Sequence, residues 1–430
     1  MAKKEIEQTE IEAPYELPEG WKWCRLGEVA DWGSGGTPSR KNPEYYQGSI
    51  PWIKTGELNE TYIFDSEEKV SEDAIKHSSA KIFPKETVVM AMYGATIGKT
   101  AIFGIDASTN QACACAICHK ELDNHFLFNF LKSKKDYFLY NAKGGAQPNI
   151  SQEIIKNTPI PLPPTLAEQQ RIVKRIESMF AKLDEAKERA QNVVDGFETR
   201  KAAILHKAFT GELTAKWRKE NGVCDDSWKI VKLEDIVKKE KYSLKAGPFG
   251  SALKKEFYVQ KGFKIYGQEQ VLNSDENYGD YFIDEDKYNE LESCKIAPND
   301  ILISLVGTIG KTLILSEKCK PGIINPRLIK ISLDVNVMIP QFFTYYFGSD
   351  YCKSKYMAVQ HGTTMDVLNM GILKQLEYPC CTLPEQVEIV RNLDIIIEKE
   401  NKAKQAAEAV LEQIDLLKKS ILARAFRGEL

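Results

Sequence analysis

Two long segments of the chain carry apolar residues at alternating intervals of three and four, which is the spacing of a coiled-coil seam. In the first segment the seam positions are Ile172, Ile176, Met179, Leu183, Ala186, Ala190, Val193, Phe197, Arg200 and Ile204. In the second they are Ile389, Leu393, Ile396, Glu400, Ala403, Ala407, Val410, Ile414, Leu417 and Ile421. The pattern predicts two helices that pair along their length, because a helix packed only on its own domain tolerates a wider and less regular apolar face.

Both segments carry the signals of helix boundaries. Thr165 and Thr382 each have a glutamate three residues later, which predicts a capping box at the start of the helix. Gly211 and Gly428 follow the last apolar positions, as C-terminal caps do. About 40 residues at about 1.5 Å per residue form a rod about 60 Å long.

Two charged residues interrupt the seams, Arg200 in the first and Glu400 in the second. An antiparallel pair related by an approximate twofold axis sets Arg200 opposite Glu400 and Leu183 opposite Leu417. A parallel pair would set each charge opposite a leucine and would bury two unpaired charges. The sequence therefore predicts an antiparallel coiled coil in this register.

Ahead of each predicted helix lie about 150 residues in which short β-like runs alternate with glycine, proline and asparagine turns. The stretch "DWGSGGTPSRKNPEYYQGSIPWIKTGEL", residues 31–58, is typical. The predicted fold class is α+β, with two β-rich domains that alternate with two long helices and a pseudo-twofold internal repeat.

The two halves of the chain repeat each other. Thr-Ile-Gly-Lys-Thr at 96–100 returns at 308–312, and the ending Ala-Phe-x-Gly-Glu-Leu at 208–213 returns at 425–430. From Gly145 and Gly362 onward the sequence predicts a constant offset of 217 residues without insertion. The predicted segments are an acidic tail at 1–20, a globular domain at 21–164, a helix at 165–217, a linker at 218–226, a second domain at 227–381 and a second helix at 382–430.

The turn "YGATIGKT" at 93–100 resembles the end of an ATP-binding P-loop, which requires four residues between its two glycines. Gly94 and Gly98 are separated by only three, and residues 100–104 read as a strand rather than a helix. We therefore expect a turn between strands at 88–93 and 100–103 that carries an exposed Lys99. A nucleotide titration of the isolated chain separates this interpretation from an ATPase.

The ten cysteines favour reduced thiols over a disulfide framework. Cys115 to His119 match the C-x-x-C-H spacing of haem attachment, but the chain shows neither an export signal nor a second ligand pair. We interpret residues 113–118 as a buried strand and expect no metal site. The pair Cys380-Cys381 takes the place of Pro163-Pro164 in the other half and is interpreted as structural.

The 430 residues are 43% hydrophobic and 28% charged, as in a globular protein, and the net charge of −3 argues against a simple basic DNA-binding protein. The N-terminus lacks the apolar core of a signal peptide, and no run of about 18 apolar residues occurs. We expect a cytoplasmic protein that does not enter a membrane.

Signatures of catalysis are missing from the sequence. Asn42-Pro43-Glu44-Tyr45 is the nearest approach to the motif of an adenine methyltransferase and lacks its second proline. Five histidines form no evident triad or ligand cluster, and Glu67-Glu68-Lys69 reads as a solvated charge run rather than half of a nuclease site. We expect a chain that is not itself an enzyme.

An antiparallel pair of equal rods would hold two globular domains at its opposite ends, an arrangement that suits a target with two separated sites, such as duplex DNA. Several motifs recur here in a characteristic order: "LPEGW" at 17–21, "GSGGTP" at 33–38, "IPWIKTGEL" at 50–58, "GGAQPNIS" at 144–151, "PLPPTLAEQQRIV" at 161–173, the two Thr-Ile-Gly-Lys-Thr turns and the two endings. With these motifs the chain resembles, over essentially its whole length, a specificity subunit of a type I restriction-modification system.

The resemblance implies that each globular domain is a target-recognition domain that reads one half of a bipartite DNA site. It further implies that the helices set the gap and dock two methyltransferase subunits, possibly with restriction subunits. S-adenosylmethionine, ATP and Mg would belong to those partners, and this chain would hold no cofactor. In the second domain "KAGPFGSALKK" replaces "GSGGTP" and "GTTMDVLN" replaces "GGAQPNIS", so the two half-sites should differ. The alternative is a coiled-coil scaffold without DNA specificity.

Candidate DNA contacts are polar and basic residues in the turns, because lysine, arginine and hydroxyl groups contact phosphates while amides and arginine read base edges. In the first domain they are Thr37, Ser39, Arg40, Lys41, Lys54, Thr55, Lys99, Lys143, Gln147 and Asn149. In the second they are Lys245, Ser251, Lys254, Lys255, Tyr266, Gln268, Lys311, His361 and Thr364.

We expect the isolated chain to bind duplex DNA weakly, because residues 21–156 contain about as many acidic as basic side chains. Methyltransferase partners would supply much of the phosphate contact and would raise the affinity roughly tenfold or more. Fluorescence anisotropy at one fixed salt concentration measures the difference. Tight, sequence-specific binding by the purified chain alone would contradict this expectation.

Overall fold

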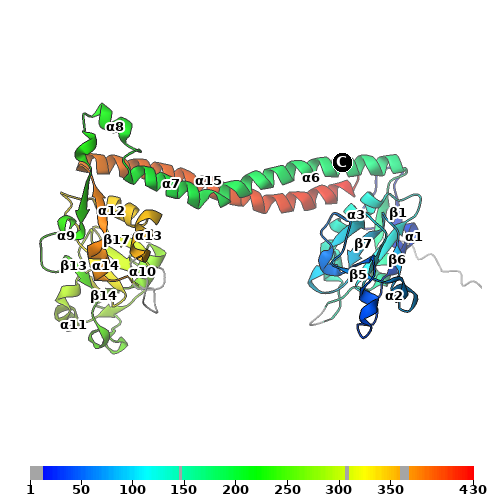
Figure 1. Cartoon of the computed structure of the whole chain (residues 1–430), viewed down its shortest axis with the longest axis horizontal. Helices are drawn as coiled ribbons and strands as arrows, with labels where there is room; N and C mark the ends of the chain where they lie inside the picture. The colour runs from blue at the N-terminus through cyan, green and yellow to red at the C-terminus, as the bar shows by residue number, and fades with distance from the viewer. Residues whose placement is uncertain (1–12, 145–147, 306–308, 359–367) are drawn as a thin grey trace, which may run out of the picture. The chain divides into compact units, whose positions relative to one another are not determined.

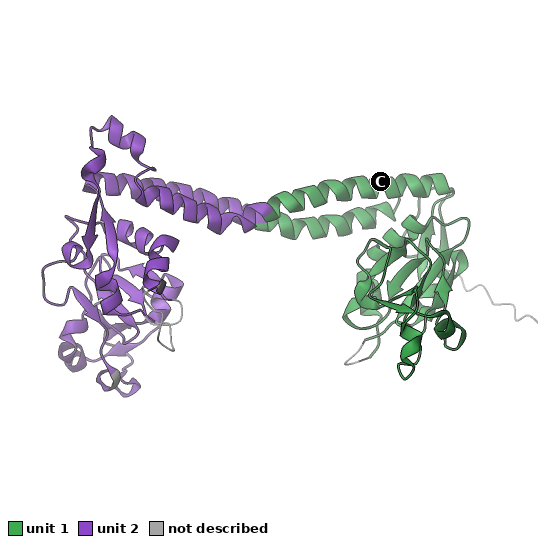
Figure 2. Ribbon diagram, viewed as in Figure 1, with its two compact units in different colours: residues 1–191, 408–430 green, residues 192–407 purple. Residues whose placement is uncertain are grey.

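The computed structural model of the chain describes residues 13–144, 148–305, 309–358 and 368–430. The chain divides into two compact units, which Figure 2 colours green and purple. Unit 1 comprises Met1–Gln191 and Glu408–Leu430, and unit 2 comprises Asn192–Ala407. Each unit therefore contains one β-rich domain and parts of the long helices.

The described residues of unit 1 form three sheets, and several of their strands are labelled in Figure 1. A five-stranded sheet has the order β2 (Ala30–Ser34), β10 (Cys113–Cys118), β7 (Val88–Ala91), β8 (Thr100–Phe103) and β4 (Tyr62–Ile63). A four-stranded sheet has the order β5 (Glu68–Val70), β3 (Ile50–Ile53), β9 (Ala107–Thr109) and β6 (Ile82–Phe83), and β1 (Lys22–Arg25) pairs with β11 (Pro159–Leu162). Its short helices are α1 (Leu26–Val29), α2 (Glu72–Lys76), α3 (Asn124–Ser133), α4 (Lys135–Tyr140) and α5 (Gln152–Asn157).

The central strands of the five-stranded sheet are buried on both faces. In β7 the side chains of Val88 and Met90 join the core beneath α3, whereas Val89 and Ala91 join a second core on the opposite face. Cys113 and Cys115 of β10 lie in that second core, so the predicted strand at 113–118 is confirmed, and it is buried over 113–116, whereas Ile117 is exposed. Continuous apolar runs, rather than alternating ones, are typical of strands covered on both sides.

Unit 2 repeats these sheets. β13 (Leu244–Ala246), β19 (Leu328–Ile331), β16 (Ile301–Ser304) and β17 (Thr312–Ile314) have the order of β2, β10, β7 and β8. β15 (Phe282–Ile283), β14 (Phe263–Tyr266) and β18 (Gly322–Ile324) match β5, β3 and β9, and β12 (Lys229–Lys232) pairs with β20 (Glu377–Cys380). Its short helices are α9 (Leu233–Ile236), α10 (Gln268–Asn273), α11 (Glu285–Glu290), α12 (Pro340–Phe347), α13 (Asp350–Ala358) and α14 (Met370–Gln375). The predicted internal repeat and the α+β class are confirmed.

The long helices are α6 (Leu166–Asp195), α7 (Phe197–Phe209) and α15 (Leu383–Ala425). In unit 1, Lys418 of α15 pairs with Asp184 of α6, and Asp415 pairs with Lys187 at 3.9 Å, so the partner numbers fall as the α6 numbers rise. In unit 2, Arg200 Nε lies 2.8 Å from Glu400 Oε2. The antiparallel pairing in the predicted register is therefore confirmed.

The seam of α15 differs from the predicted one at three positions, Ala403, Val410 and Leu417, which are exposed. All the predicted positions of α6 and α7 are buried or half-buried, but Val410 and Leu417 are 40% and 48% exposed. Leu411 and Lys418 lie half-buried in their places, and the Lys418 ammonium lies 5.1 Å from the Phe180 ring. The apolar face of α15 is wider than one seam. The row that contains Leu411 and Lys418 faces α6, because the Phe180 ring accepts the Lys418 side chain.

The predicted end of the first spacer helix and one predicted capping box need correction. The first spacer helix was expected over 165–217, but α7 ends at Phe209, and α8 (Ala215–Glu220) reaches into the predicted linker. Thr165 does accept a hydrogen bond from the Glu168 backbone N–H at 3.2 Å, as a cap does. In the second long helix, Glu385 is the counterpart of Glu168. Glu385 forms no capping box, because its buried carboxylate accepts hydrogen bonds from Thr214, Arg218 and Trp228.

The repeat also contains one insertion that the sequence comparison missed. Ser151 caps α5 and Asn369 caps α14, and these two residues are 218 apart. Thr165 and Thr382 are only 217 apart. The offset is therefore not constant, and the connection between the last strand and the long helix is one residue longer in unit 1.

Exchange of the seam charges tests the helix register. Arg200→Glu alone places two carboxylates in contact, and we expect a loss of about 0.5–1 kcal/mol in the free energy of unfolding, because the pair is partly exposed. Arg200→Glu with Glu400→Arg restores the attraction and most of the stability. Chemical denaturation measures both variants, with Arg189→Glu on the exposed face of α6 as the control. Additive losses in the double variant would contradict the register.

Candidate nucleic-acid interface

Five loops of unit 1 meet along one edge of its sheets, held by backbone hydrogen bonds. The Gly36 N–H donates to the Thr109 carbonyl, the Asn110 N–H to Ile53 and the Met92 N–H to Ala112. The Ile150 N–H donates to the Met92 carbonyl and the Gly94 N–H to Pro148, and the five distances are 2.8–3.1 Å. The loops thus joined are 33–41, 53–55, 92–94, 109–112 and the described part of 143–150. Eight of the ten predicted DNA contacts of the first domain lie in these loops, Lys99 lies in the turn at 93–100, and Gln147 lies outside the described residues.

Position 35 in the turn of this edge requires glycine, because the backbone of another loop passes close to it. A Cβ atom on Gly35 would lie 1.9 Å from the Thr109 carbonyl oxygen. In unit 2 a Cβ on Gly247 would lie 1.8 Å from the Asn325 carbonyl oxygen. No side chain fits at either position, so each unit has a close approach of two backbones here, although the carbonyl approached in unit 2 belongs to the counterpart of Asn110 and not of Thr109.

Arg40 is held by an aromatic ring and a carboxylate. Its guanidinium lies 4.0 Å above the Tyr46 ring and donates to Glu68 Oε2 at 2.6 Å. Lys54 Nζ lies 3.1 Å from the other Glu68 oxygen. The hydrogen bond from Arg40 lowers the pKa of the Glu68 carboxyl. Glu68 is therefore a structural partner of two candidate contacts rather than part of a solvated charge run. Together with Glu67, whose Oε2 lies 3.0 Å from Lys54 Nζ, it balances the charges of Arg40 and Lys54 in the free protein.

Smaller polar residues surround this cluster. The Thr37 hydroxyl donates to the Gln111 side-chain carbonyl, and Ser39 Oγ accepts from the Lys41 backbone N–H at 3.4 Å. Thr55 follows Lys54 and is half-buried. Gln111 was not among the predicted contacts, although an exposed amide at the start of a buried strand is a recognisable signal.

Lys143 and Asn149 lie side by side, because their backbones exchange two hydrogen bonds of 2.8 Å. Both are exposed, and Asn149 also bridges to Tyr93, whose side chain is 44% exposed. Tyr93 joins Gln111 as a polar residue on this edge that the sequence did not single out.

The turn at 93–100 connects two strands, as expected, and not a strand to a helix. β7 and β8 pair antiparallel across it, and Gly94 and Gly98 adopt φ of 64° and 78°. Lys99 was expected to be exposed but is half-buried. The burial of Glu60 opposes its ionisation, while the charges of Lys132, Lys135 and Lys99 together lower its pKa. Lys99 therefore belongs to a lysine cluster around one carboxylate.

The same edge recurs in unit 2. The N–H groups of Gly247, Asn325 and Leu305 donate to the carbonyls of Leu328, Tyr266 and Arg327 at 2.8–3.0 Å. Ser251, Lys254, Lys255 and Lys311 are exposed near these loops, and Lys254 Nζ lies 3.5 Å from Glu256. Lys245 and Gln268 are half-buried, and His361 and Thr364 lie outside the described residues.

Tyr266 was a wrong prediction. Its side chain is fully buried, and its hydroxyl donates to the Lys320 carbonyl at 2.8 Å. The residue ends β14 and points into the core, where a sequence pattern alone does not distinguish it from a turn residue. Two residues of this edge were missed, namely the exposed Arg327 and Phe249, whose side chain is 90% exposed. An apolar ring between a proline and a glycine was the available signal for Phe249.

The cysteine and histidine cluster has no metal-binding geometry. Burial raises the pKa of Cys113 well above the usual value and those of Cys115 and Cys118 to about 12, so these thiols stay protonated at neutral pH. His119 pairs with Asp31 at 3.2 Å, which raises its pKa. Within the part of the chain that the structure describes, no three side chains of His, Cys, Asp or Glu are grouped to hold a metal ion.

The family model of the type I restriction modification DNA specificity domain matches residues 18–194 and 225–413. The chain belongs to this family. It is 23% identical to the MjaVIII specificity subunit of Methanocaldococcus jannaschii over 96% of this chain and 94% of that one. It is 25% identical to the EcoKI specificity subunit of Escherichia coli over 96% and 90%. Recognition of a DNA sequence is the function that the family carries, and the scaffold alternative is not favoured.

The fold agrees with the family. A crystal structure of the HsdS subunit from Thermoanaerobacter tengcongensis matches with a TM-score of 0.65 at 20% identity, and the match covers 98% of this chain and 100% of that one. Among the described helices, none combines the length and the apolar character needed to cross a bilayer.

The close backbone approach at the glycine turn makes a direct prediction. Gly35→Ala forces the two loops apart, and we expect a loss of about 2 kcal/mol or more in the free energy of unfolding. Gly56→Ala is the matched control in the same unit, since no atom lies within 4 Å of the added methyl group. Denaturant titration compares the two variants, and equal stability would contradict the contact.

Proposed function

We propose that this chain is the sequence-reading subunit of a type I restriction-modification complex and performs no catalysis itself. Each unit would read one half of an asymmetric bipartite DNA site through its converging loops. The helices would fix the gap between the half-sites and dock two methyltransferase subunits, to which restriction subunits can add. The partners would supply S-adenosylmethionine, ATP and Mg chemistry, and the complex would act in the cytoplasm.

The observation that carries the proposal is one edge that the chain builds twice with different side chains. Both units have a close glycine approach and the same order of the matching strands. The backbone bonds of Asn110 and Met92 recur at Asn325 and Leu305. The exposed groups differ: unit 1 presents Gln111 and Asn149, whereas unit 2 presents Phe249 and Arg327. A common frame with different hydrogen-bonding groups suits two different base sequences.

The two sets of side chains imply different modes of contact. Amide groups such as Gln111 and Asn149 match the paired donor and acceptor of adenine in the major groove. Arg327 matches guanine or phosphate, and the exposed ring of Phe249 suits contact with a thymine methyl group or insertion at a base step. The half-site read by unit 2 would therefore depend more on the shape and deformability of the duplex.

The charge network of unit 1 fits weak binding in the absence of partners. Glu68 holds both Arg40 and Lys54, so a phosphate group has to displace a carboxylate to reach either of them. This exchange of one anion for another yields little net free energy. Specific binding would then depend on the phosphate contacts that the methyltransferase subunits add.

Selection from a random duplex library tests the proposal. The full chain is assembled with its methyltransferase partner, and the bound duplexes are sequenced. Two short conserved half-sites at a fixed separation would support sequence reading by two units. A scaffold without DNA specificity would return no conserved positions, and that outcome would overturn the proposal.

Single substitutions separate the two half-sites. Gln111→Ala removes an amide from unit 1, and we expect one base position in one half-site to lose discrimination by about 10–100-fold. Phe249→Ala should alter only the other half-site. Phe64→Ala is the control, because its ring is 68% exposed beside Gly104, at the opposite end of β8 from the loop edge. Changes in both half-sites from either substitution would contradict separate readers.

A further inference from the structure

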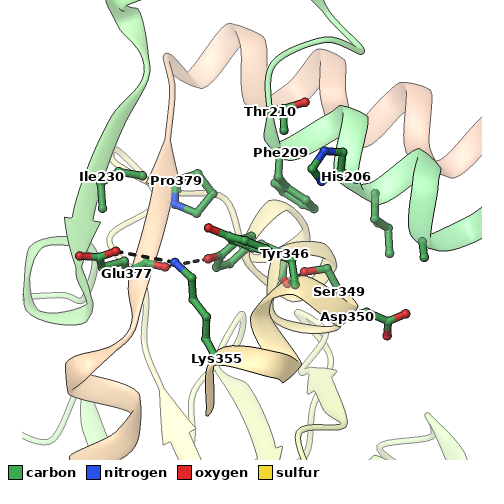
Figure 3. A pocket seen from close by; sticks show the side chains of 13 residues that line it. His206, Phe209, Thr210, Ile230, Tyr346, Ser349, Asp350, Lys355, Glu377 and Pro379 are labelled. Atoms are coloured by element: carbon green, nitrogen blue, oxygen red, sulfur yellow. Dashed lines mark hydrogen bonds and ion pairs between the residues drawn. The ribbon is translucent and has the colours of Figure 1, made fainter. Parts of the chain in front are cut away.

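Unit 2 has an apolar cavity of about 390 Å³ away from its loop edge (Figure 3). Figure 3 shows its wall formed by the end of α7, with His206 and Phe209, and by Ile230 and Pro379 of the paired strands β12 and β20. Tyr346 and Lys355 of α12 and α13 close the other side. Ile230 is 66% exposed at the mouth, which is unusual for a β-branched apolar residue in a paired strand.

The equivalent position in unit 1 is occupied. Tyr15, from the segment that precedes β1, packs edge-on against the Trp23 ring with 5.0 Å between ring centroids. Its hydroxyl donates to the Phe426 carbonyl at 2.8 Å, and the Arg427 guanidinium lies 5.7 Å from its ring. Burial raises the pKa of Tyr15 to about 12. The tyrosine thus fills a place made by one strand and the last turn of a long helix.

The strand register makes the two places equivalent. Trp23 pairs with Pro161 across β1 and β11, and Ile230 pairs with Pro379 across β12 and β20. The sequence repeat likewise equates the Ala-Phe-x-Gly endings, so that Phe426 and Arg427 correspond to Phe209 and Thr210. Three of the groups that hold Tyr15 in unit 1 therefore have counterparts at the cavity of unit 2.

The connecting segment of unit 2 leaves this place open. It is anchored elsewhere, because Arg218 donates to the buried Glu385 at 2.7 Å and to Asp225 at 3.0 Å. The residue six before Trp228, where Tyr15 stands relative to Trp21, is Gly222. Both units therefore form a place for an aromatic side chain, but the chain fills this place only in unit 1, with Tyr15.

We propose that the cavity of unit 2 binds a tyrosine side chain from an extended segment of a partner protein. The ring would rest on Ile230 and Pro379, and its hydroxyl would donate to the Phe209 carbonyl, as Tyr15 does to Phe426. This site shares no residue with the loop edge proposed to face DNA. The proposed tyrosine binding can therefore be tested independently of the proposed function.

A peptide with the sequence of residues 13–20, APYELPEG, is the probe, since it carries the tyrosine in its native context. We expect a fluorescent form of this peptide to bind the full chain saturably in an anisotropy titration. A peptide with alanine in place of the tyrosine should show no measurable binding. Thr210→Arg supplies the guanidinium that unit 1 has at Arg427 and should tighten binding roughly two- to fivefold.

Ile230→Glu should weaken peptide binding at least about tenfold, because it places a carboxylate at an apolar mouth. Leu416→Glu is the matched control, since Leu416 of α15 is also 66% exposed and does not line the cavity. Thermal melting checks that both variants are folded. Tyr15→Ala should open the equivalent place in unit 1 and raise the stoichiometry from one peptide to two.

Three outcomes would overturn the proposal. They are the absence of saturable binding to the folded chain, binding that Ile230→Glu leaves unchanged, and equal loss in Ile230→Glu and Leu416→Glu. The second outcome would mean that the peptide only displaces Tyr15 in unit 1. None of these measurements involves DNA, so a failed library selection and a failed peptide titration remain distinguishable.

Discussion

Helix α15 supplies side chains to the hydrophobic cores of both units, and the rest of the structure depends on this sharing. Near its start, Ile389 and Leu393 pack in the core of unit 2 with Leu205 of α7. Near its end, Phe426 lies edge-on to Phe126 at 5.1 Å in the core of unit 1. Apolar burial is the main stabilising contribution to a fold, so each unit is complete only when this one helix runs in the observed direction.

The direction of the helices was predictable because the sequence places two opposite charges where apolar residues belong. Arg200 and Glu400 satisfy each other only in an antiparallel pair, whereas an all-apolar seam would have accepted either direction. The row of α15 that faces its partner was not predictable. Val410 and Leu411 are adjacent and both apolar, and the choice between their rows depends on rings such as Phe180, which belong to the other helix.

The loop edges were predictable as turns, but the interactions within them were not. Glycine and proline mark where the chain reverses, so most of the candidate contacts fall in the converging loops. The role of Glu68 depends on Arg40 and Lys54, which reach it from two other loops. Tyr266 looked like a turn residue because its strand ends there, and only the hydroxyl bond to Lys320 reveals a core position. Contacts between distant segments carry no local signature in the sequence.

The sharing of α15 has a consequence for the order in which the chain folds as it is synthesised. The core of unit 1 includes Ile421, Leu422 and Phe426, which are synthesised after the whole of unit 2. Until then the surfaces of Phe126 and Phe130 that Phe426 covers stay open to solvent. Unit 1 is therefore completed only after unit 2 has been synthesised, and a chain that stops before Ile421 would leave the core of unit 1 incomplete.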